Sequence, residues 1–345
     1  MRRARLLRGA LLAGSAAAAL VVAEAGLRLQ ARAGADLDTQ ARRSRPSRWP
    51  EIVYELKPDL RGVFRGRPLT TNSHGFRGPE VAREKPPGVF RIAGLGDSQM
   101  FGWGVSDEET YLRRLERALD ARARRAKQGP RGVEVLNFAV PGYNTVMQVA
   151  TFEHRALAFS PDLVIVHYAR NDLAAPHFAL EGLGGPRSYL LTALRAAVAG
   201  WRDRGDAVPA RASRRARREA ASRPYAHLGG RAAYARAMAR LAELCRRRGI
   251  PVLVLTLERG EEPEMRAAVR RHGMRLVPVV PRFYDYLGER GLARSRGAWA
   301  RTFRLGRDGH PNPLAHRLIA EALLAEIEGM QERVRPPARS PRPGA

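Results

Sequence analysis

Five residues of this chain could do chemistry together: a serine, a glycine and an asparagine that follow apolar runs, and an acid and a histidine that precede the last predicted helix. Ser98 follows the run at 89–95 and belongs to the tripeptide Gly96-Asp97-Ser98. A serine just beyond a buried strand has its hydroxyl held at the rim of the sheet, where open α/β sheets bind their ligands. The same tripeptide also arises as an ordinary strand-to-helix turn. Ser98 is therefore a candidate nucleophile, and the segments downstream decide between these two interpretations.

Three further segments follow predicted strands or precede a predicted helix. Gly142 comes after the second apolar run, Asn171 after the third, and His310 shortly before the last predicted helix. Each has a structural alternative: a turn glycine, a loop cap and a residue preceding a capped helix, respectively. Because the carboxyl ends of parallel strands meet at one edge of a sheet, their joint occurrence favours a common site.

Together these residues are suited to acyl transfer, which needs a nucleophile, a base and donors for an oxyanion. We expect Ser98 to attack a carbonyl, His310 to take its proton and return it to the leaving alcohol, and Asp308 to orient the imidazole. The oxyanion hole is predicted from the backbone amides of Ser98 and Gly142 and the side-chain amide of Asn171. The histidines show no metal-ligand spacing and the chain has no phosphate-cradling loop, so we predict neither a metal nor a cofactor.

The elements that position these residues alternate between strand and helix. Continuous apolar runs predict strands at 89–95, 133–138, 163–168, 251–257 and 275–280. Helices are predicted after the capping box of Ser106 and Glu109, from about Asn144, at 232–248 and at 312–330. This alternation predicts an α/β fold, a doubly wound three-layer α/β/α sandwich around a mostly parallel, roughly five-stranded sheet. The segment 174–230 interrupts it and is interpreted as an insertion, either a lid or a plain surface loop.

The strong positive charge of the chain does not by itself indicate a nucleic-acid partner. The formal net charge is +27, but all except three of the 61 basic residues are arginine, as a GC-rich coding sequence produces. The densest basic runs, 211–218 and 246–248, are not interleaved with aromatic residues on which bases would stack. We therefore predict no nucleic-acid binding. The single cysteine, Cys245, excludes an internal disulfide framework.

The N-terminal segment has the pattern of an export signal, with arginines up to Arg8 followed by an apolar stretch. Because apolar character continues to Leu29, we favour an uncleaved membrane anchor over 1–29, with cleavage near Glu24 as the alternative. Composition then predicts a polar tether at 30–53 and a disordered tail at 331–345, so that the domain carrying the candidate site spans 54–330.

These residues resemble the SGNH or GDSL hydrolases, a family named for residues that match Ser98, Gly142, Asn171 and His310. The resemblance covers about 54–327, and the segment 71–78 looks like one found in membrane-anchored bacterial members. It implies a flavodoxin-like fold and a bacterial protein anchored in a membrane, with its catalytic domain on the extracytoplasmic side. The sequence departs from the family pattern at two positions. Ala169 stands where the family often has glycine, and Arg307 stands three residues before the histidine, where the acid often lies. Asp308 is therefore either the acid or a residue that only fixes the loop.

The favoured hypothesis is a serine esterase that removes an acyl group such as acetyl from a cell-envelope glycan or lipid, so that the partner is a small-molecule or polysaccharide acyl ester. An O-acyltransferase of exopolysaccharide modification would use the same site, because water and a sugar hydroxyl accept the same acyl-enzyme. A non-catalytic binding protein on the same fold is the third alternative. Intact Ser98 and His310 argue against it.

Overall fold

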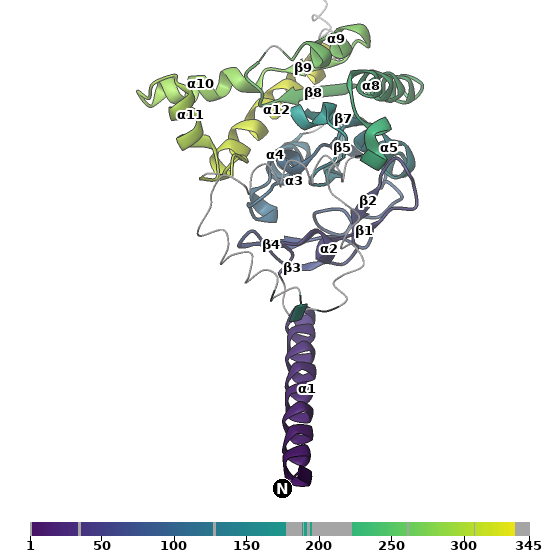
Figure 1. The fold of residues 1–345 in the computed structure, drawn as a ribbon. Helices are drawn as coiled ribbons and strands as arrows, with labels where there is room; N and C mark the ends of the chain where they lie inside the picture. The colour runs from purple at the N-terminus through teal and green to yellow at the C-terminus, as the bar shows by residue number, and fades with distance from the viewer. Residues whose placement is uncertain are drawn as a thin grey trace, which may run out of the picture.

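A computed structural model describes residues 2–33, 36–126, 129–176, 223–260, 262–306 and 308–334, together with positions 188, 190, 191 and 194. The described chain forms a body around one central sheet, and a long N-terminal helix projects from it (Figure 1).

The central sheet has five parallel strands in the order β6-β5-β7-β8-β9. Their bounds are β5 (Val89–Leu95), β6 (Gly132–Asn137), β7 (Leu163–Tyr168), β8 (Val252–Thr256) and β9 (Arg275–Val277). The sheet and the helices around it confirm the predicted α/β class. The first strand of this sheet along the chain is β5, which lies in its interior. The chain forms β6 on one side of β5 and then β7, β8 and β9 on the other side, as in doubly wound sheets.

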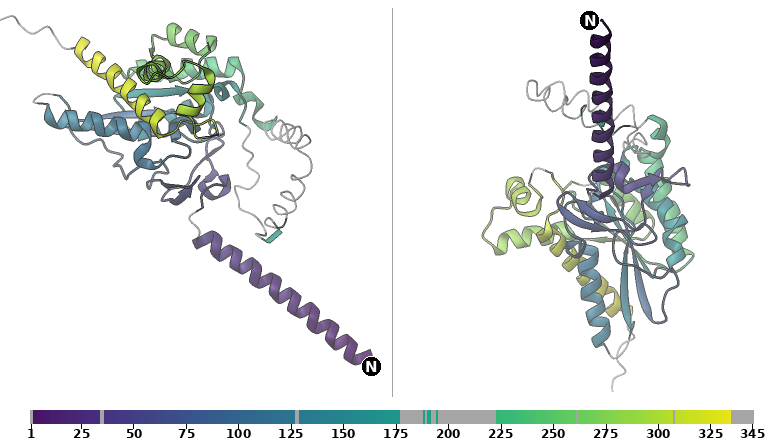
Figure 2. Two further views of the ribbon diagram at one scale, coloured as in Figure 1. Left: turned by 90° about the vertical axis from the view of Figure 1, so that its left-hand side faces the viewer. Right: turned by 90° about the horizontal axis from the view of Figure 1, so that it is seen from below.

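Helices cover both faces of the sheet, so its strands are apolar on both sides. On one face α4 (Tyr111–Arg125) and α12 (Pro313–Val334) lie side by side (Figure 2). On the other face α5 (Thr145–His154), α8 (Arg231–Arg246) and α9 (Pro263–Arg271) pack in succession. Along β7 the side chains alternate between two buried clusters: Leu163 and Ile165 belong to one, and Val164 and Val166 to the other.

The N-terminal region is more ordered than the predicted tether at 30–53. Residues from 36 onward form α2 (Gln40–Arg43) and β1 (Ser44–Pro46), which pairs with β2 (Tyr54–Leu56). A second hairpin follows, made of β3 (Arg61–Phe64) and β4 (Arg67–Thr70). Leu37 and Ile52 are buried, and the Arg43 guanidinium donates to the carbonyls of Leu37 and Asp38 at 3.1 and 2.8 Å. Burial of these few apolar side chains holds the segment on the body despite its polar composition.

Another correction to the expected elements lies after β8. The strand predicted at 275–280 ends at Val277, because Pro278 cannot donate to the ladder and a helix starts beyond it. That helix, α10 (Val279–Glu289), packs with α11 (Arg296–Phe303) through an aromatic cluster. The cluster includes Phe283 and Trp299, whose ring centroids are 4.7 Å apart. A helix was expected after the fifth strand, but no bounds were predicted for α9, α10 or α11.

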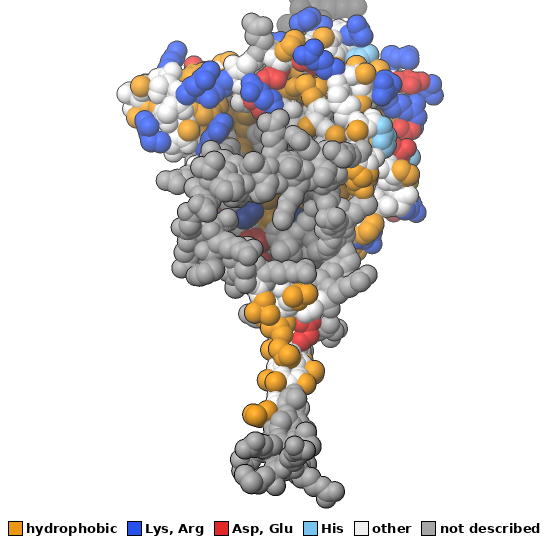
Figure 3. All heavy atoms as spheres, in the orientation of Figure 1, with side chains coloured by type: hydrophobic (Ala, Val, Ile, Leu, Met, Phe, Trp, Pro, Cys, Tyr) orange, Lys and Arg blue, Asp and Glu red, His pale blue; other side chains and the backbone are white. Residues whose placement is uncertain are grey.

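The N-terminal helix α1 (Arg2–Ala33) projects from the body near the β3–β4 hairpin (Figures 1 and 2). Its described surface carries exposed apolar side chains, including Leu11 and Leu20 (Figure 3). No helix among the described residues combines the length and the apolar character needed to cross a bilayer. The anchor expected at 1–29 thus gains no support. Most of the insertion expected at 174–230 and the tail beyond Val334 lie outside the described residues.

Candidate active site

Ser98 lies where β5 passes into a short helix, α3 (Ser98–Phe101). Asp97 caps this helix: its carboxylate accepts a hydrogen bond from the Gln99 amide at 2.9 Å. Gly96 makes the close approach possible, since a Cβ there would lie 2.6 Å from the Met100 Cβ. Asp97 is buried, and burial raises the pKa of its carboxyl group. The turn therefore fixes the Ser98 hydroxyl at the carboxyl edge of the sheet.

His310 reaches Ser98 from the loop before α12. The His310 Nε2 atom lies 2.8 Å from the Ser98 Oγ atom, and His310 Nδ1 contacts the Asp308 carboxylate. If Nδ1 carries the proton that Asp308 accepts, Nε2 is free to accept the serine proton. The loop is held by backbone hydrogen bonds from the Leu305 amide to the His310 carbonyl and from the Asn312 amide to the Phe303 carbonyl, both 2.9 Å long. Ser98, His310 and Asp308 thus form a continuous chain of hydrogen-bonding contacts.

Asp308 has a second partner that the sequence did not indicate. Its Oδ2 atom accepts a hydrogen bond from the Trp103 indole N–H at 3.1 Å. Partial burial raises the pKa of Asp308, but the hydrogen bond and charge of His310 and the indole N–H outweigh this effect, and the net shift is downward. Asp308 is therefore a carboxylate at neutral pH, which is the form that can orient an imidazole.

Gly142 and Asn171 lie on the loops that follow β6 and β7. Gly142 has φ of 85°, a left-handed conformation that favours glycine, and the Tyr143 amide beyond it donates to the Val140 carbonyl at 3.1 Å. The Asn171 Nδ2 atom donates to the Tyr143 carbonyl at 3.2 Å, and the same side chain interacts with the Asp97 carboxyl group. These contacts join the two loops to the turn that holds Ser98.

A buried acid fixes the loop that carries Asn171. Asp172 accepts hydrogen bonds from the Ala169 amide at 2.8 Å and from the Gln148 side chain at 2.7 Å. Burial, reinforced by the charge of Asp97, raises the pKa of Asp172 well above its ordinary value. Ala169, the residue that replaces the expected glycine, is itself buried and donates to this acid, so the replacement leaves the loop anchored.

A small cavity of about 50 Å³ is lined by sequence neighbours of Ser98 and His310, although neither of these two residues lines it. Gln99, the neighbour of Ser98, lines it, as do Gly309 and Pro311 on either side of His310. Its remaining walls come from β8, α10, α11 and α12 and the segments next to them: Leu257, Glu258, Phe283, Trp299, Phe303, Arg304 and Ala315. The α10–α11 pair thus shares this cavity with residues that adjoin Ser98 and His310 in the sequence.

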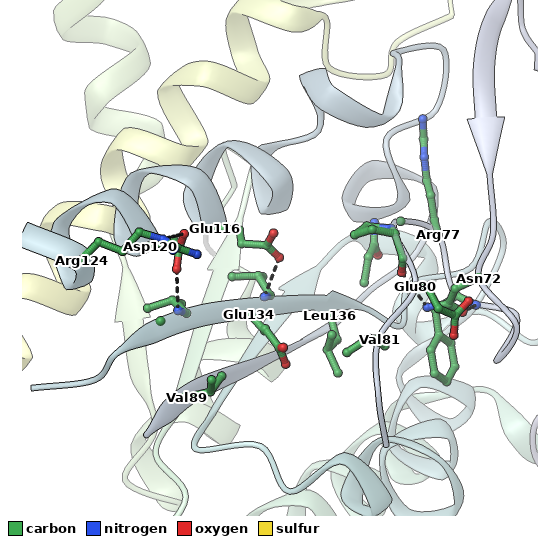
Figure 4. A pocket seen from close by; sticks show the side chains of 17 residues that line it. Asn72, Arg77, Glu80, Val81, Val89, Glu116, Asp120, Arg124, Glu134 and Leu136 are labelled. Atoms are coloured by element: carbon green, nitrogen blue, oxygen red, sulfur yellow. Dashed lines mark hydrogen bonds and ion pairs between the residues drawn. The ribbon is translucent and has the colours of Figure 1, made fainter. Parts of the chain in front are cut away.

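A larger hollow of about 300 Å³ lies elsewhere, along the outer edge of β6 (Figure 4). The Glu116 and Asp120 carboxylates, from α4, accept hydrogen bonds there from the Val135 and Val133 amides at 2.8 and 3.1 Å. None of the predicted site residues lines this hollow. Within the described parts of the chain, no group of three or more histidine, cysteine, aspartate or glutamate side chains is arranged to hold a metal ion.

Comparison with known proteins identifies the family. The sequence pattern of the GDSL-like Lipase/Acylhydrolase family matches residues 95–318. This chain belongs to that family. Like other GDSL-like acylhydrolases, it is an enzyme that hydrolyses ester bonds, and its match begins at the strand end that leads into Ser98. No curated protein sequence matches the chain.

The GDSL-like chain is also similar to several solved structures. One is LAE5, an alpha/beta hydrolase enzyme from the metagenome of Lake Arreo, Spain, at 18% identity and a TM-score of 0.40, covering 68% of this chain and 94% of that one. Another is a lipase/acylhydrolase from Enterococcus faecalis, at 14% identity and a TM-score of 0.41, covering 70% and 96%. A third is the esterase EstA from Pseudoalteromonas sp., at 13% identity and a TM-score of 0.40, covering 70% and 98%.

Proposed function

We propose that this acylhydrolase is a serine esterase in which Ser98 is the nucleophile, His310 the general base and acid, and Asp308 the residue that orients the imidazole. The observation that carries the proposal is the 2.8 Å contact between His310 Nε2 and Ser98 Oγ, with the Asp308 carboxylate on the other ring nitrogen. A base that contacts a nucleophile on one side and an orienting acid on the other forms the constellation that activates a serine.

In the first half of the reaction, the Ser98 Oγ atom attacks the carbonyl carbon of the ester while His310 Nε2 takes its proton. The negative charge that develops on the carbonyl oxygen is stabilised by the Ser98 and Gly142 amides and the Asn171 side-chain amide. The bond to the alcohol oxygen then breaks, and the imidazolium gives its proton to the leaving alcohol. The acyl group remains on Ser98.

In the second half, a water molecule attacks the acyl carbon and His310 takes one of its protons. The bond to Ser98 Oγ breaks, the serine recovers its proton from the imidazolium, and a carboxylic acid leaves. Asp308 stays ionised throughout and stabilises the transient positive charge on the ring. Its lowered pKa supports this role.

We propose an acetyl group, or a chain of similar length, as the acyl part of the substrate. The cavity beside Gln99 and Gly309 has a volume of about 50 Å³. Such a cavity exceeds the minimum of about 10–15 Å³ that a single water-sized group needs, so it can take a small group. The half-buried Leu257 and the buried Trp299 and Phe303 among its walls suit the methyl end of an acetyl group.

We propose a cell-envelope glycan or lipid as the alcohol part, with the catalytic domain on the extracytoplasmic side. The support is the N-terminal pattern of arginines followed by an apolar stretch, which is typical of exported bacterial proteins. Fusing residues 1–53 to alkaline phosphatase, which is active only after export, tests the location. An inactive fusion, beside an active one carrying a known export signal, would contradict it.

The site is tested with the full chain in detergent, together with Ser98→Ala. We expect a serine-directed fluorophosphonate to label the wild type and not the variant, and p-nitrophenyl acetate to be hydrolysed faster than the butyrate and octanoate esters. If the wild type is labelled but hydrolyses none of these esters, and acyl transfer is observed once an acetylated sugar donor and a sugar acceptor are added, the acyltransferase is favoured. Absence of labelling on folded protein would favour the non-catalytic binding protein.

A further inference from the structure

Trp103 connects the predicted acid and base of the site to the N-terminal part of the chain. Its indole N–H donates to Asp308 Oδ2 at 3.1 Å, and its ring stacks on the His310 imidazole with centroids 4.9 Å apart and planes inclined by 14°. The Arg65 guanidinium carbon lies 4.8 Å from the centroid of the indole ring, and the Phe64 ring meets it edge-on at 4.8 Å. One side chain thus contacts both Asp308 and His310 and is itself packed on the β3–β4 hairpin.

Two glycines with left-handed backbone conformations flank Trp103 in its loop. Gly102 and Gly104, on either side, have φ of 90° and 72°, in the left-handed region that favours glycine. A Cβ on Gly102 would lie 2.6 Å from the Thr110 Cγ2 atom, and one on Gly104 would lie 2.7 Å from the Leu305 Cδ1 atom. The loop therefore approaches both α4 and the histidine loop too closely to carry side chains there.

A buried arginine anchors the same loop. Arg77 donates to the carbonyls of Phe101, Gly102 and Val105 at 2.8, 2.5 and 2.6 Å, and its Nε atom binds the Asp107 carboxylate at 2.7 Å. Arg77 lies in the segment 71–78, which the esterase chemistry did not require. This segment and the β3–β4 hairpin both precede the region that matches the family. Residues outside the family match therefore hold Trp103 against the site.

We propose that Trp103 is a positioning residue of the esterase site, which fixes the Asp308 carboxylate through its indole N–H and the His310 ring through its stacked face. The inference rests on the proposed function. The Asp308 side chain is 39% exposed and can rotate about its terminal bond, so one contact to His310 does not fix its plane. The indole N–H holds Oδ2, which leaves Oδ1 turned toward the imidazole. The stacked ring keeps Nε2 directed at Ser98.

The test compares Trp103→Phe, Trp103→Leu and the matched control Trp49→Phe. Trp49 also stacks on a histidine, His154, with centroids 5.3 Å apart and planes inclined by 13°, but it has no hydrogen bond to an acid of the site. Phenylalanine at 103 keeps the stacked ring and loses the N–H donor, whereas leucine loses both. We expect Trp103→Phe to lower kcat on p-nitrophenyl acetate about 10-fold, the effect of one hydrogen bond to a charged group.

Trp103→Leu is expected to lower kcat by a further ~3-fold or more, because an aromatic stack is lost as well. KM is expected to stay close to the wild-type value in both variants, since neither change removes a substrate contact. The pH profile supplies a readout that packing alone would not change. His310, Trp103 and Arg65 all lower the pKa of Asp308, so loss of the indole N–H raises that pKa and moves the acidic limb of kcat to higher pH.

A Trp103→Phe enzyme with wild-type kcat and an unchanged pH profile would overturn the inference, even if its thermal stability fell as much as that of Trp49→Phe. A general loss of fold is recognised by circular dichroism and by comparison with that control. Failure of the proposed function gives a different result, since the wild type itself would then neither be labelled nor hydrolyse esters. In that case the His310 Nδ1 proton resonance still reports whether Trp103→Phe alters the contact between histidine and acid.

Discussion

Replacing Asp308 by asparagine tests the acid of the site, because it keeps the shape of the side chain and removes its charge. In the wild type, Oδ1 contacts His310 Nδ1 and Oδ2 accepts from the Trp103 indole 3.1 Å away. An amide has a single oxygen, so it can satisfy only one of these two donors. With its NH₂ group facing Nδ1, the imidazole would carry its proton on Nε2 and could not accept the Ser98 proton.

The expected loss follows from the charge interaction that disappears. An ion pair near a protein surface is worth about 4 kcal/mol at a separation of 4 Å. The Asp308 side chain is 39% exposed, so we reduce this figure for solvent screening to about 2–3 kcal/mol. Each ~1.36 kcal/mol of transition-state stabilisation corresponds to a factor of ten in rate. Turnover of Asp308→Asn is therefore expected to fall about 30- to 200-fold.

The assay measures kcat on p-nitrophenyl acetate and the free energy of unfolding for Asp308→Asn and for a control, Asp285→Asn. Asp285 is an exposed acid on α10, 4.0 Å from the Arg294 guanidinium. We expect the control to keep wild-type turnover and both variants to remain within about 0.5 kcal/mol of wild-type stability. A kcat for Asp308→Asn within about threefold of wild type, a change of less than ~1 kcal/mol, would refute the catalytic role and leave Asp308 as a residue that fixes the loop.

Three other changes probe separate parts of the structure. Asn171→Ala removes one of three proposed oxyanion donors and is expected to lower kcat about 100-fold with little change in KM, whereas an unchanged kcat would exclude that donor. Leu257→Ala enlarges the 50 Å³ cavity and should raise the ratio of butyrate to acetate hydrolysis, so a constant ratio would exclude the cavity as the acyl site. Burial lowers the pKa of His316 to about 3 from an ordinary 6.5. Between these two pH values the imidazole binds a proton in the unfolded chain but not in the folded protein. The free energy of unfolding should therefore fall below about pH 6.5, by about 2 kcal/mol at pH 5 for this residue. Chemical denaturation of His316→Gln should show a shallower pH dependence than that of the exposed control His227→Gln, and equal slopes would contradict the assignment.

The sequence predicted the parts of the fold that depend on local pattern. Continuous apolar runs located all five strands of the central sheet, and the capping box at Ser106 located the start of the α4 region. The end of β9 was misplaced because the apolar run continues past Pro278 into a helix, and apolar character alone does not separate the two. The β3–β4 hairpin was missed because its strands are only four residues long, although Gly66 with φ of 74° makes a turn typical of tight hairpins.

The sequence predicted only those site residues whose side chains are common catalytic groups. Ser98, Asp308 and His310 were expected together and lie in contact. Trp103 was not expected, because it lies 205 residues from Asp308 in the sequence and a tryptophan between glycines has many structural uses. The contact of Asn171 with the Tyr143 carbonyl likewise depends on the paths of two loops. Contacts between residues far apart in the chain produce no local pattern that a single sequence could reveal.

The Glu116 and Asp120 carboxylates along β6 protect this edge of the sheet from pairing with a strand of another chain. An edge strand normally offers a row of unpaired amides that a second chain can extend. Here the Val133 and Val135 amides are already bound by side chains of α4, and Asn137 forms a bridge with Arg77. A foreign strand would have to displace two charged acceptors of the same chain before it gained its first hydrogen bonds. The edge of the sheet that carries Ser98 can thus stay open while the β6 flank is protected from pairing with another chain.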